Sequence, residues 1–149
     1  MKLAVDLGTK TGYAFTTSTA ANIVSGVWDM KPGRFDGGGM RILKFRENLA
    51  KIHAAHPIDV VWYEEVRRHL GTDAAHLYGA LGGQLMAFCE EQTPKIPYEG
   101  VPVGAIKKWW TGKGNAPKEL MVEMARRWGY EPVDDNEADA IAILHMKLS

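Results

Sequence analysis

The sequence has little of several features that define whole classes of protein. Its one cysteine, Cys89, cannot form a disulfide within the chain, which fits the reducing cytoplasm. No apolar stretch approaches the roughly 20 residues that a membrane-spanning helix needs. The N-terminus leads into a strand pattern without the features of a signal peptide. We therefore expect a cytoplasmic protein with no membrane partner.

The chain also lacks net charge, because 18 Lys and Arg residues balance 18 Asp and Glu residues. A neutral molecule has no overall field that attracts nucleic acid, so any site for a polyanion has to be a local basic patch. The length of 149 residues is typical of one domain, and the 46% of hydrophobic residues can form a sizeable core. We therefore treat residues 1–149 as a single domain.

Apolar periodicity and turn signals predict three strands, followed by helices that alternate with two more strands. The strands are expected over Lys2–Leu7, Gly12–Thr17, Ile23–Met30, Asp59–Tyr63 and Lys95–Val101. The helices are expected over Met40–His53, Thr72–Gln92, Val103–Trp110, Ala116–Trp128 and Asp134–Leu148. This order predicts an α/β domain whose mixed sheet of about five strands begins as an antiparallel meander, continues parallel and is flanked by helices.

Three carboxylates occupy positions where a charge is costly. Asp6 interrupts an apolar strand, and Glu64 follows the dense strand pattern of Asp59–Tyr63. Both stand at the strand ends where α/β domains bind ligands. Asp139 lies beyond the first turn of the last predicted helix, so the helix dipole does not account for it. A turn-forming Asp6 and a solvated Glu64 are the structural alternatives.

Acids brought together from separate elements repel one another unless a cation lies among them. Oxygen ligands with no Cys or His at metal-binding spacing nearby favour Mg²⁺ or Mn²⁺ over zinc. Two such ions about 4 Å apart are a common device for cleaving phosphodiesters. We therefore expect Asp6, Glu64 and Asp139 to bind one or two of these ions.

The motifs resemble, in order and spacing, those of RuvC-type Holliday junction resolvases in the ribonuclease H-like nuclease superfamily. The resemblance spans nearly the whole chain and rests on Asp6–Tyr13 (DLGTKTGY), Trp62–Val66 (WYEEV), Leu77–Gly83 (LYGALGG), Gly112–Lys118 (GKGNAPK) and Glu137–Ala140 (EADA). It implies a ribonuclease H-like fold and a metal-dependent, structure-selective DNA endonuclease. Such an enzyme makes paired cuts in four-way junctions during DNA recombination. The compact, glycine-rich sequence resembles phage or prophage members more than cellular ones.

By position, the resemblance implies that Asp6, Glu64 and Asp139 are the catalytic, metal-binding acids, with two ions per site. The family has a further acid or His three residues before the last Asp, where this chain has Asn136. The fourth ligand is then either Asn136 or the neighbouring Asp135.

The resemblance also implies contacts with branched DNA. Lys107 and Lys118 fall on family lysines near the scissile phosphate, which gives Lys118 a catalytic role. Lys118 also fits the first turn of a helix capped by Asn115, where a bound phosphate would offset the misplaced cation. The family often has a junction-opening aromatic residue where this chain has Arg67 and Arg68, whose guanidinium groups can hold phosphates or stack on a base. A solvated lysine and a solvated basic turn are the alternatives.

A symmetric junction cut on two opposing strands needs two active sites related by a twofold axis, so we expect a homodimer. The long helix expected from residue 72 has a stripe of small residues, formed by Ala75, Gly79, Gly82 or Gly83, and Met86. Glycines inside a helix are costly and indicate the close approach of another backbone. That backbone belongs either to the partner's equivalent helix or to the protein's own sheet.

Three other functions are compatible with the sequence. Asp6–Gly12 resembles the first phosphate loop of actin-like ATPases and sugar kinases, although 149 residues are too few for the two lobes of that class. A ribonuclease H-like nuclease acting on RNA, flaps or other branched intermediates would have the same fold and site. The neutral Asn136 is the one feature that favours a metal-binding module without turnover.

Overall fold

The computed structural model describes residues 1–17, 22–69 and 71–149. Its strands are β1 (Lys2–Asp6), β2 (Lys10–Thr16), β3 (Ile23–Asp29), β4 (Val60–Glu65) and β5 (Tyr98–Pro102). Its helices are α1 (Gly39–Ala55), α2 (Thr72–Glu91), α3 (Val103–Thr111), α4 (Lys118–Arg127) and α5 (Asp135–Leu148). The predicted elements are present in the predicted order.

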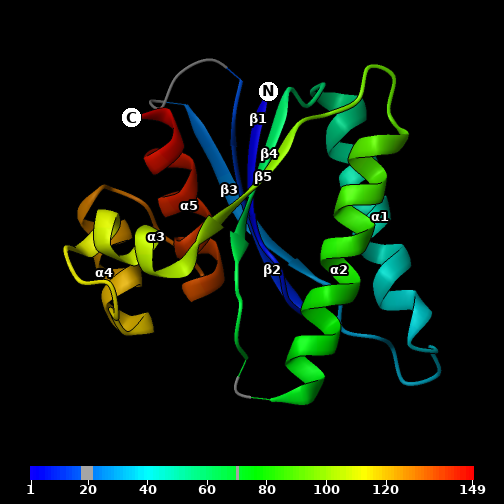
Figure 1. The fold of residues 1–149 in the computed structure, drawn as a ribbon, viewed down its shortest axis with the longest axis horizontal. Helices are drawn as coiled ribbons and strands as arrows, with labels where there is room; N and C mark the ends of the chain where they lie inside the picture. The colour runs from blue at the N-terminus through cyan, green and yellow to red at the C-terminus, as the bar shows by residue number, and fades with distance from the viewer. Residues whose placement is uncertain (18–21, 70) are drawn as a thin grey trace.

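The described strands form one five-stranded sheet in the order β3-β2-β1-β4-β5 (Figure 1). The pairs β1–β2 and β2–β3 are antiparallel, whereas β1–β4 and β4–β5 are parallel. The predicted fold class, a meander continued by parallel strands, is therefore confirmed. In the parallel ladder Val5 pairs with Tyr63, so Asp6 and Glu64 follow at the same edge of the sheet.

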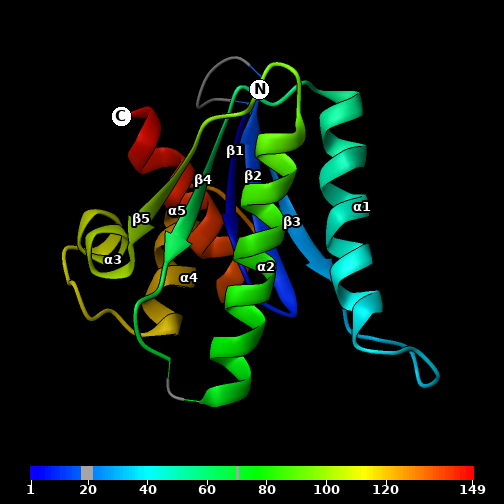
Figure 2. The same cartoon turned by 45° about the vertical axis from the view of Figure 1, so that its right-hand side comes forward.

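Helices cover both faces of the sheet (Figures 1 and 2). α1 and α2 lie on one face, and α3, α4 and α5 lie on the other. Along β1, Leu3 and Val5 belong to the core beneath α1 and α2, Ala4 belongs to the core beneath α5, and all three are fully buried. This explains the continuous apolar run around β1, because a strand covered on both faces needs apolar residues in succession. In the part of the chain that the structure describes, no helix has the length and hydrophobicity of a membrane span.

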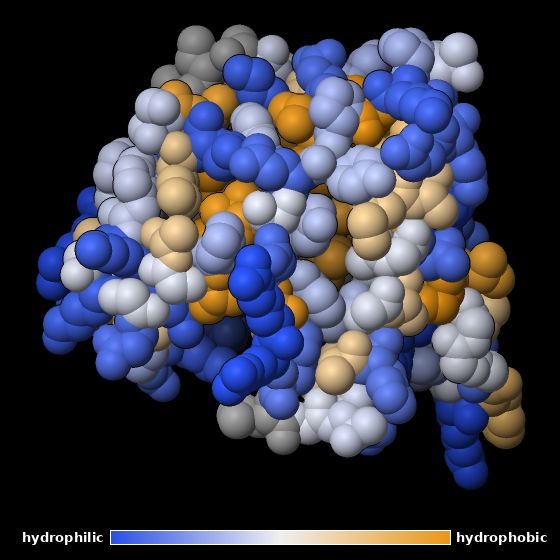
Figure 3. Space-filling model, in the orientation of Figure 1, coloured by the Kyte–Doolittle hydropathy of each residue, from blue (hydrophilic) through white to orange (hydrophobic). Residues whose placement is uncertain are grey.

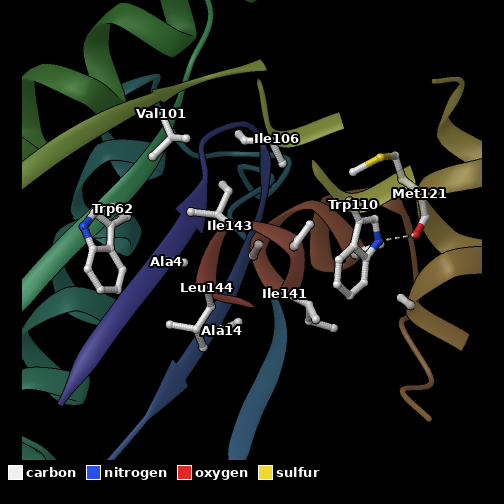
Figure 4. Packing of buried hydrophobic residues seen from close by; sticks show 14 of the residues in the cluster. Ala4, Ala14, Trp62, Val101, Ile106, Trp110, Met121, Ile141, Ile143 and Leu144 are labelled. Carbon is white, nitrogen blue, oxygen red and sulfur yellow. Dashed lines mark hydrogen bonds between the residues drawn. The ribbon is translucent and has the colours of Figure 1, made fainter. Parts of the chain in front are cut away.

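α5 lies between the sheet and the smaller helices α3 and α4 (Figure 4). Its residues Ile141, Ile143 and Leu144 are fully buried in this core. Trp110 Nε1 donates a hydrogen bond to the Met121 carbonyl oxygen at 3.2 Å, which joins α3 to α4. The acid-bearing helix is therefore held on both sides.

Gly12 on β2 allows α5 to approach the sheet closely. A β-carbon at this position would overlap the backbone carbonyl group of Asn136, near the start of α5. A larger residue at position 12 would push the N-terminal end of α5 away from β2. Gly12, within the Asp6–Tyr13 motif, thus sets the position of the helix that bears Asp139.

One local prediction needs correction. α4 begins at Lys118, and its N-cap residue is Pro117, without a side-chain cap. The predicted cap Asn115 is therefore wrong, because Pro117 is extended, with a ψ of 164°, and the helix starts only after it. The stripe on α2 is divided between the two alternatives left open for it: Gly82 is buried near Leu7 of the protein's own core, whereas Gly79 and Gly83 face open space.

Candidate active site

Asp6, Glu64 and Asp139 meet where β1, β4 and α5 converge. One carboxylate oxygen from each lies within 4.8 Å of the oxygens of the other two. Asp6 is 8% exposed and Glu64 is 9% exposed, so the acids lie at the base of the site and not on its rim. The structure thus brings together the three acids that the sequence singled out separately.

The electrostatics of this acidic triad favour a bound cation. Burial raises the pKa of Asp6 well above its usual range, and the charges of Glu64 and Asp139 raise it further. The pKa of Asp139 is raised to about 8, first by burial and then by the charge of Glu64, against the lowering effects of a hydrogen bond with Asp6 and of the charge of Lys107. Asp139 Oδ1 is buried and has no hydrogen-bond partner. Desolvated, mutually repelling carboxylates with a free oxygen fit Mg²⁺ or Mn²⁺, whose charge would favour their ionised forms.

The triad lines a cleft of about 400 Å³. The space-filling view shows a hollow at this place, between helices α3 and α4 and the hydrophilic segment that follows β4 (Figure 3). The predicted lysines line the same cleft, Lys107 from α3 and Lys118 from α4. Positive side chains therefore face the acids across a space that a phosphodiester can enter.

Both candidates for the fourth ligand, Asp135 and Asn136, also line the cleft. Asp135 Oδ2 lies 3.9 Å from Lys118 Nζ and does not belong to the converging group of carboxylates. The Asn136 side-chain amide donates to Asp134 Oδ2 at 3.3 Å. The identity of the fourth ligand stays a prediction.

The remaining acids at the start of α5 have structural partners. Asp134 is the N-cap residue, and its Oδ1 accepts a hydrogen bond from the Glu137 backbone N–H at 2.9 Å. The buried Glu137 carboxylate accepts from the Val133 N–H at 2.7 Å and from Ser25 Oγ on β3 at 2.8 Å. These contacts fix the first turn of α5 against the sheet.

Tyr78 on α2 holds the end of β4 in position. In the sequence it stood out only as a member of the Leu77–Gly83 motif. Its hydroxyl donates to the Glu64 carbonyl oxygen at 2.7 Å and accepts from the Val66 N–H at 3.1 Å. The ring of His69 lies 4.9 Å from the Tyr78 ring and borders the cleft. The end of β4 is therefore held by α2, although no spacing signal in the sequence shows this contact.

Arg67 and Arg68 lie beside the acidic cleft and not within its lining. They line a neighbouring depression together with Pro102 and Val103. Arg67 Nε is 3.0 Å from Glu65 Oε1, and its side chain is highly exposed. Their role in binding DNA stays a prediction, and the geometry gives them a flanking position.

Comparison with solved structures identifies the fold. RuvC from Thermus thermophilus has a TM-score of 0.70 and 20% identity, over 98% of this chain and 97% of that one. The same protein in complex with Holliday junction substrate has a TM-score of 0.70 and 18% identity, and the match covers 95% of this chain and 89% of that one. The yeast mitochondrial Holliday junction resolvase Ydc2 has a TM-score of 0.64 and 14% identity, and the match covers 95% of this chain and 75% of that one. No protein-family model and no curated protein matches the sequence. This chain therefore has the ribonuclease H-like fold of the RuvC Holliday junction resolvases, the family that its motifs resemble.

Proposed function

We propose that this chain is a metal-dependent, structure-selective endonuclease that resolves four-way DNA junctions by paired cuts. The convergence of Asp6, Glu64 and Asp139, with one unpartnered buried oxygen, carries the proposal. The fold supports it, because a protein of the same fold is solved in complex with Holliday junction substrate.

In this proposal the acidic triad holds Mg²⁺ or Mn²⁺, with two ions per site. Ions held in this way activate the attacking water and stabilise the leaving oxygen of a phosphodiester. Lys107 and Lys118 bind oxygens of the scissile phosphate and orient the strand over the acids. Lys118 is 80% exposed in its side chain and only loosely paired with Asp135, so it is free to bind phosphate.

The test uses a panel of four-way, three-way, flap and linear DNAs and an RNA–DNA hybrid, each with Mg²⁺ or Mn²⁺. We expect cuts on opposing strands of the four-way junction that leave 5′-phosphate and 3′-hydroxyl ends. Asp6→Asn should bind the junction but not cut it, because cationic contacts supply most of the affinity. If the protein instead cuts the flap or the RNA–DNA hybrid in preference to the four-way junction, it is a nuclease for RNA or flaps and not a junction resolvase. An Asp6→Asn variant that cuts at the wild-type rate would overturn the site.

The proposed enzyme is a homodimer, since paired cuts need two sites related by a twofold axis. The outer face of α2 offers a contact surface, because Gly79 and Gly83 face open space and Met86 is 37% exposed. Small residues at these positions allow a second helix to approach closely.

Light scattering should give about twice the mass of one chain. Gly79→Leu and Gly83→Leu should yield folded monomers that no longer make paired cuts, because the structure has room for a side chain at both positions. Gly82→Leu is the contrasting variant, expected to lower the thermal stability because Gly82 is buried. A wild-type monomer that makes paired cuts would contradict the dimer.

A further inference from the structure

A groove continues from the acidic cleft past the N-terminal ends of α2 and α1. Three depressions of about 400, 310 and 500 Å³ adjoin one another along this line. The residues that adjacent depressions share are Leu7, His69 and Ala74 at the first boundary and Arg41, Asp73 and Leu77 at the second. The last depression reaches Gly38, in the loop before α1. A groove made of three adjoining depressions suits an extended polymer better than one small molecule.

Arg41 lines both outer depressions of this groove. Its Nε is buried without a hydrogen-bond partner, and no ion pair joins its guanidinium to a described residue. Asp73 lines the same two depressions, yet it forms no ion pair with Arg41 within the described chain. An unpaired, partly buried guanidinium is costly. Its planar fork matches the oxygens of a phosphate group.

The segment around Arg41 is strongly basic. Residues 31–46 contain five Lys and Arg residues and a single acid, which gives a net charge of +4 in a chain whose total is zero. Arg46 is paired with Glu91, which leaves most of this charge on the loop and the first turns of α1. A local concentration of positive charge beside a groove favours a polyanion.

The loop between β3 and α1 carries a fully exposed aromatic ring. Phe35 is 93% exposed, and the Arg34 guanidinium lies 5.5 Å from the centre of its ring. The loop is anchored, because Asp36 accepts from the Gly33 N–H at 2.7 Å and pairs with Lys44 at 3.7 Å. It extends beyond the body of the protein at the end where α1 and α2 begin (Figures 1 and 3). An exposed ring next to a guanidinium is a suitable platform for a nucleic-acid base.

We infer that this groove binds a DNA strand that leaves the acidic cleft, with Arg41 on a backbone phosphate and Phe35 stacked on a base at its outer end. The inference rests on the proposed function and adds a second contact region to it, separate from the depression that Arg67 and Arg68 line.

Junction binding without divalent ions tests Arg41 separately from cleavage. Arg41→Ala should make the dependence of log Kd on log salt shallower by about one unit, the effect of one lost phosphate contact. Lys51→Ala is the matched control, because Lys51 is exposed on the same helix about 15 Å further along its axis, and it should leave the slope unchanged. Arg41→Lys should restore the slope but not the full affinity, since an ammonium group lacks the fork.

Four-way junctions with 2-aminopurine at successive positions near the branch test Phe35. The wild type should change the fluorescence at one position, and Phe35→Ala and Phe35→Leu should abolish that change, because leucine keeps the apolar surface but not the flat ring. Val24→Ala, which alters an exposed apolar side chain on β3, is the control and should behave as the wild type.

Each failure has a distinct signature. If the wild type binds and cuts junctions but Arg41→Ala has the slope of Lys51→Ala, the groove inference is wrong and the proposed function stands. If Arg41→Ala converts the dimer to a monomer without changing the salt dependence of binding, the groove is a subunit contact. If the wild type shows no binding to branched DNA, the proposed function fails first.

Discussion

Two acids on the same helix, Glu137 and Asp139, differ in what surrounds them. Glu137 has hydrogen-bond donors for both carboxylate oxygens, from the Val133 backbone and from Ser25. Asp139 faces two further acids and has one oxygen without a partner. A buried carboxylate with its own donors stabilises the fold, whereas one facing other carboxylates costs stability until a cation binds. Replacing each acid should therefore affect activity and stability in opposite ways.

The largest effect is expected for Asp139→Asn. Loss of a carboxylate from the triad should lower the cleavage rate by more than about 100-fold, the upper range for losing a group that merely supports a metal ligand. Above about pH 8, where Asp139 is ionised, the metal-free variant should melt no lower than the wild type, because the amide removes a repelling charge. Cleavage assays and thermal denaturation without divalent ions measure both effects. A variant that is inactive because it unfolds would contradict the comparison.

Glu137→Ala should have the reverse outcome. It leaves the Val133 N–H and Ser25 hydroxyl without their acceptor and should lower the free energy of unfolding by about 2 kcal/mol. Below its melting temperature the variant should keep most of its cleavage activity, since Glu137 lies outside the acidic cleft. Urea denaturation at constant pH gives the stability. Loss of activity in a variant as stable as the wild type would instead place Glu137 in the site.

The role of the fourth metal ligand falls to either Asp135 or Asn136 on α5. If Asp135 takes this role, Asp135→Ala should lower the cleavage rate about 10-fold or more, and Asn136→Ala should have a smaller effect. Raising the Mg²⁺ concentration should partly restore the Asp135→Ala rate. The reverse ranking would assign the role to Asn136. Asp135→Asn is the additional control, because it keeps the shape of the side chain while removing its charge beside Lys118.

The smallest effect concerns the pH dependence of stability. The folded-state pKa of Asp139 is raised from 3.8 to about 8, so its bound proton stabilises the folded, metal-free protein at low pH. This contribution is complete below about pH 4 and is lost as the pH rises towards 8. The melting temperature of the metal-free wild type should therefore fall more steeply than that of Asp139→Asn between pH 5 and 8. Saturating Mg²⁺ should remove the difference, and parallel curves without Mg²⁺ would contradict it.

The sequence was sufficient for the fold class and for the acids of the triad, because each acid interrupts an apolar pattern that is visible locally. It did not show what satisfies the Glu137 carboxylate, since the Ser25 hydroxyl lies 112 residues away in the chain. It also gave no signal for the unpaired state of Arg41. Periodicity shows which face of a helix is apolar, but the partners of a polar side chain depend on the tertiary contacts.

The close contact between Gly12 and the backbone of Asn136 links the site to the order in which the chain is made. The strands β1 and β2 are synthesised before the helix that rests on Gly12, and Asp139 is 133 residues after Asp6. Until α5 docks, Asp6 and Glu64 lack the third carboxylate of the triad. The proposed DNA-cutting activity therefore belongs to the completed fold, and a nascent or truncated chain without α5 would be harmless to DNA.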